Sequence, residues 1–190
     1  PFVGIKVVAY TGQMSNQPMS DTARAKSNIV LIGMPGVGKS TVGVLLAKAL
    51  SRSFVDTDLV VQSAEGRRLQ DIIDADGLDV FLKAEERHVL ALECRNAVIS
   101  TGGSAPYSER AMAKLRQDGT VVYLKLDLAT LHRRITNMDS RGIAIGPGQT
   151  FDALYAGRAP LYERCADIVI DCAGLDHEQT VAAVLAALGA

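Results

Sequence analysis

The sequence predicts an α/β fold in which a mostly parallel sheet carries helices on both faces. From residue 28 onward, short apolar runs alternate with stretches of helical apolar spacing, which is typical of strands connected by helices. A glycine-rich stretch joins the first apolar run to the first helical one. The length of 190 residues, with 48% hydrophobic and 22% charged residues, fits one ordinary globular domain.

The predicted elements follow from these patterns in chain order. The first strand, residues 28–32, is a continuous run of mainly branched apolar residues, as expected for a strand buried on both faces. The first helix, residues 39–50, has apolar side chains at helical spacing. Further strands are expected at residues 54–55, 97–99, 120–124 and 168–170. Further helices are expected at residues 69–73, 80–95, 108–117, 128–135, 151–164 and 177–188.

Two segments do not fit this alternation. Residues 1–26 lack sustained periodicity, so we expect an N-terminal extension of unknown role ahead of a domain that spans residues 27–190. Residues 137–150 contain three glycines and one proline between two predicted helices. A loop of this length in a compact domain is usually functional or mobile, and we interpret it as a lid.

A phosphate-binding motif follows the first predicted strand. Residues 33–40 read Gly-Met-Pro-Gly-Val-Gly-Lys-Ser and match G-x-x-x-x-G-K-S/T at every position, directly before a helix. In this motif backbone N–H groups surround phosphate oxygens, Lys39 contacts the terminal phosphates, and the Ser40 hydroxyl is a Mg²⁺ ligand. A tight strand-to-helix turn alone would not require Lys39 and Ser40. The motif therefore predicts a nucleotide phosphate site.

Two carboxylates follow the second predicted strand. Asp56 and Asp58 are separated by one residue, and positions i and i+2 of a strand share a face, so both can point into one cleft. One could hold Mg²⁺ through water while the other orients or deprotonates an attacking hydroxyl. The alternative is that Asp58 caps a helix. Because the phosphate motif lies one helix upstream, we favour the functional interpretation.

These motifs, taken in order, resemble the shikimate kinase family of P-loop NTPases with the nucleoside-monophosphate-kinase type of fold. The similarity spans residue 28 to about residue 171 and rests on residues 33–41, 56–58, 69–73, Gly77, Phe81 with Glu85, Gly102, Gly103, Arg134, Arg141 and residues 158–162. The resemblance implies a five-stranded parallel sheet of order 2-3-1-4-5, a lid, and transfer of the ATP γ-phosphoryl group to a ring hydroxyl.

The resemblance also assigns roles to individual residues. It implies catalytic roles for Lys39, Asp58 and Arg141, of which Arg141 is the lid arginine. Ser40 and Asp56 would hold Mg²⁺. The nucleotide would contact Gly33, Met34, Pro35, Gly36, Val37, Gly38, Lys39, Ser40, Thr41, Arg134 and Arg141. The acceptor would contact Asp58, Leu82, Gly102, Gly103 and Arg158, with Arg158 on the substrate carboxylate. Taken alone, Arg141 also fits a solvated loop charge, and Arg158 a surface ion pair.

The sequence departs from the family pattern around the acceptor. Leu82 stands where the family has an arginine that holds the shikimate carboxylate, Ser104 replaces the third of three glycines, and Gly142 replaces the proline after the lid arginine. Loss of the guanidinium removes a contact of about 1.5–3 kcal/mol, or on the order of 10–100-fold in affinity. We therefore expect a weak or relaxed shikimate kinase, or a kinase for a related polyol without a carboxylate. The remaining alternative is a nucleotide-binding regulatory module without transfer activity.

Composition excludes several other classes. The formal net charge of −1 gives no general attraction to nucleic acid or anionic membranes. No apolar run is long enough to span a membrane, and three cysteines without a C-x-x-C spacing disfavour a disulfide framework or zinc site. His88, His132 and His177 are isolated, and we interpret them as surface or packing residues. We expect a cytoplasmic, monomeric enzyme that uses ATP and Mg²⁺ on a small-molecule hydroxyl acceptor, without nucleic acid or membrane.

Overall fold

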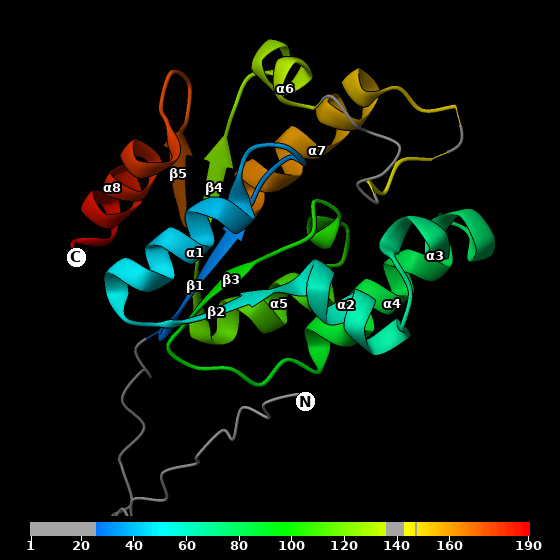
Figure 1. Cartoon of the computed structure of the whole chain (residues 1–190), viewed down its shortest axis with the longest axis horizontal. Helices are drawn as coiled ribbons and strands as arrows, with labels where there is room; N and C mark the ends of the chain where they lie inside the picture. Colours follow the sequence, from blue (N-terminus) through cyan, green and yellow to red (C-terminus); the bar gives the residue numbers. More distant parts are fainter. Residues whose placement is uncertain (1–25, 136–142, 147) are drawn as a thin grey trace, which may run out of the picture.

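The computed structural model describes residues 26–135, 143–146 and 148–190 (Figure 1). One five-stranded sheet has the order β2-β3-β1-β4-β5, and every neighbouring pair of strands is parallel. The strands are β1 (Asn28–Ile32), β2 (Ser53–Asp56), β3 (Ala97–Ser100), β4 (Gly119–Lys125) and β5 (Ile168–Asp171). The predicted α/β class and strand order are confirmed.

Helices cover both faces of this sheet. α1 and α8 pack against each other on one face, while α5 and α7 lie on the other, and α2, α3 and α4 form a group beyond the β2 edge (Figure 1). The helices are α1 (Lys39–Leu50), α2 (Thr57–Glu65), α3 (Leu69–Asp76), α4 (Leu78–Leu90), η1 (Ala105–Tyr107), α5 (Glu109–Asp118), α6 (Leu128–Arg134), α7 (Phe151–Cys165) and α8 (His177–Leu188). No helix in these ranges is both long and apolar enough to cross a lipid bilayer.

The central strand explains why the first apolar run is continuous. β1 pairs with β3 on one side and β4 on the other, and Val30, Leu31 and Ile32 are all 0% exposed. Because helices cover both faces of the sheet, every side chain of this strand enters the core. The end of β1 is thereby fixed at the middle of the sheet, where the phosphate motif begins.

Helix α2 was absent from the predicted elements, and α4 is displaced from its expected range. α2 buries only Thr57 and Val61, which is too few apolar contacts for a periodic pattern. α4 ends at Leu90 rather than at residue 95. The chain beyond it contacts β1, where the Asn28 side chain donates a hydrogen bond to the Cys94 carbonyl at 2.9 Å.

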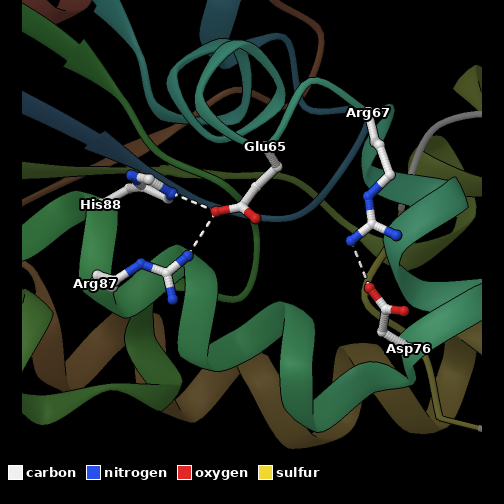
Figure 2. A network of polar contacts seen from close by, with 5 residues as sticks. All are labelled: Glu65, Arg67, Asp76, Arg87 and His88. Carbon is white, nitrogen blue, oxygen red and sulfur yellow. Dashed lines mark hydrogen bonds and ion pairs between the residues drawn. The ribbon is translucent and has the colours of Figure 1, made fainter.

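The group of α2, α3 and α4 has a small core of its own and a polar network on its surface. Glu65, at the end of α2, accepts hydrogen bonds from Arg87 and His88 of α4, the latter at 2.7 Å (Figure 2). The hydrogen bond from His88, followed by that from Arg87, lowers the pKa of the Glu65 carboxyl. Arg67 pairs with Asp76 at the end of α3. The hydrogen bonds of Glu65 hold α2 against α4, whereas the Arg67–Asp76 pair connects the residues just before α3 to the end of that helix. The small core consists of Val61, Leu69, Ile72, Phe81 and Ala144.

Two sequence-based expectations fall largely outside the described residues. The N-terminal extension is described only at Lys26, and the predicted lid only at residues 143–146 and 148–150. Both therefore stay predictions.

A pair of substitutions in α1 tests the assignment of its buried face. Leu46 is 0% exposed and Val44 is 50% exposed. Leu46→Ala removes buried methyl groups and leaves a cavity, so we expect the free energy of unfolding to fall by about 2–5 kcal/mol. The control Val44→Ala should change it by less than about 0.5 kcal/mol. Urea denaturation followed by circular dichroism measures both, and equal losses would contradict the assignment.

Candidate active site

The phosphate loop turns sharply between the end of β1 and the start of α1. Gly36 and Gly38 have φ values of +84° and +103°, a left-handed backbone that residues with a Cβ rarely adopt. Gly38 is the N-terminal cap residue of α1, which begins at Lys39. The positive end of the helix dipole therefore faces the cavity beside the loop, as a phosphate site requires.

Lys39 is buried beneath this loop. Its Nζ donates hydrogen bonds to the carbonyl oxygens of Gly33 at 2.9 Å and Met34 at 3.1 Å. Burial lowers the pKa of Lys39 to about 8, although the negative charges of Asp58 and Asp56 act in the opposite direction. The ammonium group thus remains largely charged at neutral pH and lies next to both predicted carboxylates.

Ser40 and Asp56, the two residues predicted to hold Mg²⁺, are in hydrogen-bond contact. The Ser40 hydroxyl donates to Asp56 Oδ2 at 2.7 Å and lies 3.4 Å from the Ser100 hydroxyl. A hydroxyl and a carboxylate are oxygen ligands of the kind that Mg²⁺ prefers, with phosphate and water completing the shell. Across the described ranges no group of three or more His, Cys, Asp or Glu side chains could hold a metal ion. The donor set therefore fits a cation that takes its other ligands from a nucleotide.

Asp56 and Asp58 share the site by a different geometry from the one predicted. Asp56 ends β2 and caps α2, because its Oδ1 accepts hydrogen bonds from the N–H groups of Asp58 and Leu59. Asp58 lies in the first helical turn, so the expected alternation along a strand is wrong, and the helix cap is Asp56 rather than Asp58. Burial, helped by the charge of Asp56 and opposed by Lys39, raises the pKa of Asp58 to about 6.

The turn after β3 is crowded against acidic side chains. The Gly102 N–H donates to the Thr57 hydroxyl at 2.9 Å. A Cβ on Gly102 would lie 2.1 Å from Glu85 Oε1 and 2.6 Å from Asp58 Oδ1, so any larger residue would force both acidic side chains to move. Ser104 donates to Glu85 Oε2 at 2.7 Å, and Glu85 is 3% exposed.

Arg158 brings a second cation into the site from α7. It is 1% exposed, its Nε donates to the Tyr107 hydroxyl at 3.2 Å, and its Nη2 donates to the Ala144 carbonyl. The guanidinium carbon lies 5.0 Å from the centre of the Tyr107 ring, in cation–π range. Its Nη1 is buried without a hydrogen-bond partner among the described residues and lies beside Gly103. A buried guanidinium N–H without a partner is stabilised by an anionic or carbonyl oxygen.

Lys39, Ser40, Asp58 and Arg158 line one cleft with a volume of about 980 Å³. The predicted residues that do not line it are Gly33, Met34, Val37, Asp56, Leu82 and Gly102. Leu82 lines an adjoining outer cavity, which shares Ser104 with the cleft. Arg141 lies outside the described residues. The predicted residues that line the cleft are Pro35, Gly36, Gly38, Lys39, Ser40, Thr41, Asp58, Gly103, Arg134 and Arg158.

Several cleft residues escaped sequence reasoning. His177, interpreted above as a surface or packing residue, lies at the start of α8, and its Nε2 would be 3.0 Å from a Cβ on Gly38. Asp176 caps the same helix in a capping box, in which its side chain accepts a hydrogen bond from the Gln179 N–H at 2.8 Å. With Arg134, whose Nη1 donates to the Val37 carbonyl at 3.3 Å, these residues form the end of the cleft away from Arg158.

Sequence comparison identifies relatives across most of the chain. The sequence model of the shikimate kinase family matches residues 35–189. A shikimate kinase of Ruegeria pomeroyi is 36% identical over 170 residues, which cover 87% of this chain and 87% of that protein. A shikimate kinase of Mycobacterium tuberculosis is 41% identical over 145 residues, which cover 75% of this chain and 82% of that protein.

Solved structures agree with this assignment. A shikimate kinase from Acinetobacter baumannii in complex with shikimate superimposes with a TM-score of 0.76 at 27% identity, covering 86% of this chain and 93% of that one. A shikimate kinase from Aquifex aeolicus superimposes with a TM-score of 0.73 at 30% identity, covering 85% and 96%. The motif order, the fold and these relatives together show that this chain is a small-molecule kinase that belongs to the shikimate kinase family.

Proposed function

We propose that this enzyme transfers the terminal phosphoryl group of ATP to a hydroxyl of shikimate, with Mg²⁺ as the metal. The observation that carries the proposal is that Lys39, Asp58 and Arg158 line one cleft. Such a transfer requires a cation that binds the phosphates, a carboxylate for the acceptor hydroxyl, and a group that binds the acceptor anion.

The nucleotide half of the reaction relies on positioning. The N–H groups of the phosphate loop and the ammonium group of Lys39 would surround the terminal phosphates. Mg²⁺, held by Ser40 and Asp56, would neutralise charge on the phosphate oxygens. Arg134 borders the opposite end of the cleft, where the nucleobase would lie. Arg141, predicted to reach over the phosphates from the lid, remains part of this proposal.

Asp58 would accept the proton of the attacking hydroxyl. A carboxyl whose pKa is raised to about 6 is mostly ionised at neutral pH, yet it is a stronger base than an exposed aspartate. Because Asp58 interacts with Lys39, the attacking hydroxyl would lie next to the lysine that binds the phosphates.

Arg158 favours an acceptor that carries a carboxylate over an uncharged polyol. A buried guanidinium with one unpartnered N–H donor is stabilised by an anionic oxygen. A relative in the same family was solved in complex with shikimate, which carries such a group. Because Leu82 supplies no second cation, we infer weaker binding than two arginines would give.

An ADP-release assay separates the candidate functions. We expect ADP formation with shikimate and Mg-ATP, and much less with uncharged cyclitols. The reverse preference would support the polyol alternative, and no ADP with any acceptor would support a regulatory module.

We also propose that the enzyme acts as a monomer in the cytoplasm. We propose that it does so without nucleic acid, because its net charge of −1 provides no general attraction to polyanions.

Replacement of Asp58 tests its role as the base. Asp58→Asn should lower kcat by about 10²-fold or more, because the amide cannot accept the proton, while Mg-ATP binding is retained. Since the protonated carboxyl is inactive, kcat of the wild-type enzyme should fall about tenfold per pH unit below pH 6. Steady-state kinetics measures both effects. The exposed Asp79→Asn serves as the control and should keep wild-type kcat.

Restoring a cation at position 82 tests the acceptor. Leu82→Arg should lower KM for shikimate by on the order of 10-fold, because a guanidinium adds a charge-assisted hydrogen bond. Leu82→Met, which conserves volume without charge, should leave KM near the wild-type value. Tight micromolar use of shikimate by the wild-type enzyme would instead show that the leucine does not weaken the site.

A further inference from the structure

Glu85 is a buried acid with few hydrogen bonds. It lies on α4, is 3% exposed, and receives one hydrogen bond, from the Ser104 hydroxyl to Oε2 at 2.7 Å. Its other oxygen, Oε1, is shielded from solvent and has no hydrogen-bond partner in the described part of the chain. A carboxylate in this position would lack the two or three donors that normally stabilise a buried negative charge.

The cations nearest to Glu85 are committed to other partners. Lys39 of α1 donates to carbonyls of the phosphate loop, and Arg158 of α7 donates to the Tyr107 hydroxyl and the Ala144 carbonyl. Both interact with Glu85 only through space. Leu82, one helical turn before Glu85, offers no charge. Glu85 therefore has no ion-pair partner among the described residues.

Asp58 of α2 opposes ionisation of Glu85. Asp58 Oδ1 and Glu85 Oε1 lie 2.6 Å and 2.1 Å from the same point, the place that a Cβ on Gly102 would occupy. The two acidic oxygens are therefore close neighbours, and two negative charges there repel each other. Burial is the largest cause that raises the pKa of Glu85 to about 7; the Ser104 hydrogen bond opposes it, the charge of Asp58 adds to it, and the charges of Arg158 and Lys39 oppose it less strongly.

The outer side of Glu85 offers no compensating charge either. The charged residues of the outer cavity are Lys83, Glu86 and Arg87 on α4 and Arg110 on α5. Glu86 pairs with Arg110, and Arg87 pairs with Glu65 of α2. Lys83 is exposed to solvent. Since no cation of the described residues forms an ion pair with Glu85, protonation is how this carboxyl loses its negative charge.

We propose that Glu85 determines how tightly the enzyme holds an anionic acceptor, and that the acceptor carboxylate binds Arg158 only when Glu85 carries a proton. This inference rests on the proposed function, because it concerns the carboxylate of the same acceptor. An ionised Glu85 cancels the field of Arg158 and repels the incoming anion, whereas a neutral Glu85 leaves the guanidinium charge free. Protonation of Glu85 thereby offsets the absence of the arginine that the family has at position 82.

The pH dependence of KM tests this proposal. KM for shikimate should rise about tenfold per pH unit above pH 7, because ionised Glu85 then predominates and opposes the anion. KM for the uncharged carboxamide of shikimate should stay level over the same range, and kcat should change much less than KM. A level KM for shikimate between pH 7 and 8.5 would overturn the proposal.

Matched variants assign the effect to Glu85. In Glu85→Gln the rise of KM with pH should disappear, because the amide cannot ionise. Glu86→Gln, a change of the next residue on the same helix, should keep the rise. A rise that persists in Glu85→Gln would place the titration on another group, such as Lys39, and would contradict the proposal.

Calorimetry on the wild-type enzyme gives a readout that needs neither a variant nor turnover. Shikimate is titrated at pH 8 in two buffers with different heats of ionisation. We expect uptake approaching one proton per bound shikimate, and uptake close to zero would refute the coupling. If shikimate binds at pH 6.5 without proton uptake at pH 8, only this inference fails. If shikimate neither binds nor is phosphorylated at pH 6.5, the proposed function fails with it.

Discussion

The burial of Lys39 beneath the phosphate loop is the constraint on which the rest of the site depends. Lys39 is only 8% exposed, and a buried ammonium group keeps its charge only where other polar groups replace water. Two loop carbonyls and the charges of Asp58 and Asp56 provide that environment. Because these aspartates are placed by the end of β2 and the first turn of α2, the loop, the second strand and the second helix must fold together for the site to exist.

The nucleotide half of the site could be predicted from the sequence because its signals are local. A continuous apolar strand, eight motif residues and a periodic helix lie within residues 28–50, and the structure places them as expected. Helix α2 could not be predicted in this way. It buries only Thr57 and Val61, and its start depends on a cap that Asp56 supplies, so the geometry that joins Asp56 to Asp58 was missed.

The acceptor half was harder to predict because its contacts are long-range. The sequence shows that Leu82 and Ser104 each depart from the family pattern, but it does not show that both adjoin one carboxyl. The Ser104 hydroxyl and Glu85 are 19 residues apart and meet only because α4 packs beside the turn after β3. His177 is a similar case: it is far from the phosphate loop in sequence, and α8 brings it next to Gly38.

Ser104 lines both the cleft and the outer cavity, so the two cavities adjoin at this side chain. The outer cavity has a volume of about 610 Å³, within the range of small-molecule sites. It also borders Glu85 and Leu82. A synthetic inhibitor bound in the outer cavity would contact Glu85 from the side opposite the cleft. It would not compete with the nucleotide, which is abundant in cells. The apolar surface of the leucine would then give selectivity over enzymes that carry an arginine at that position.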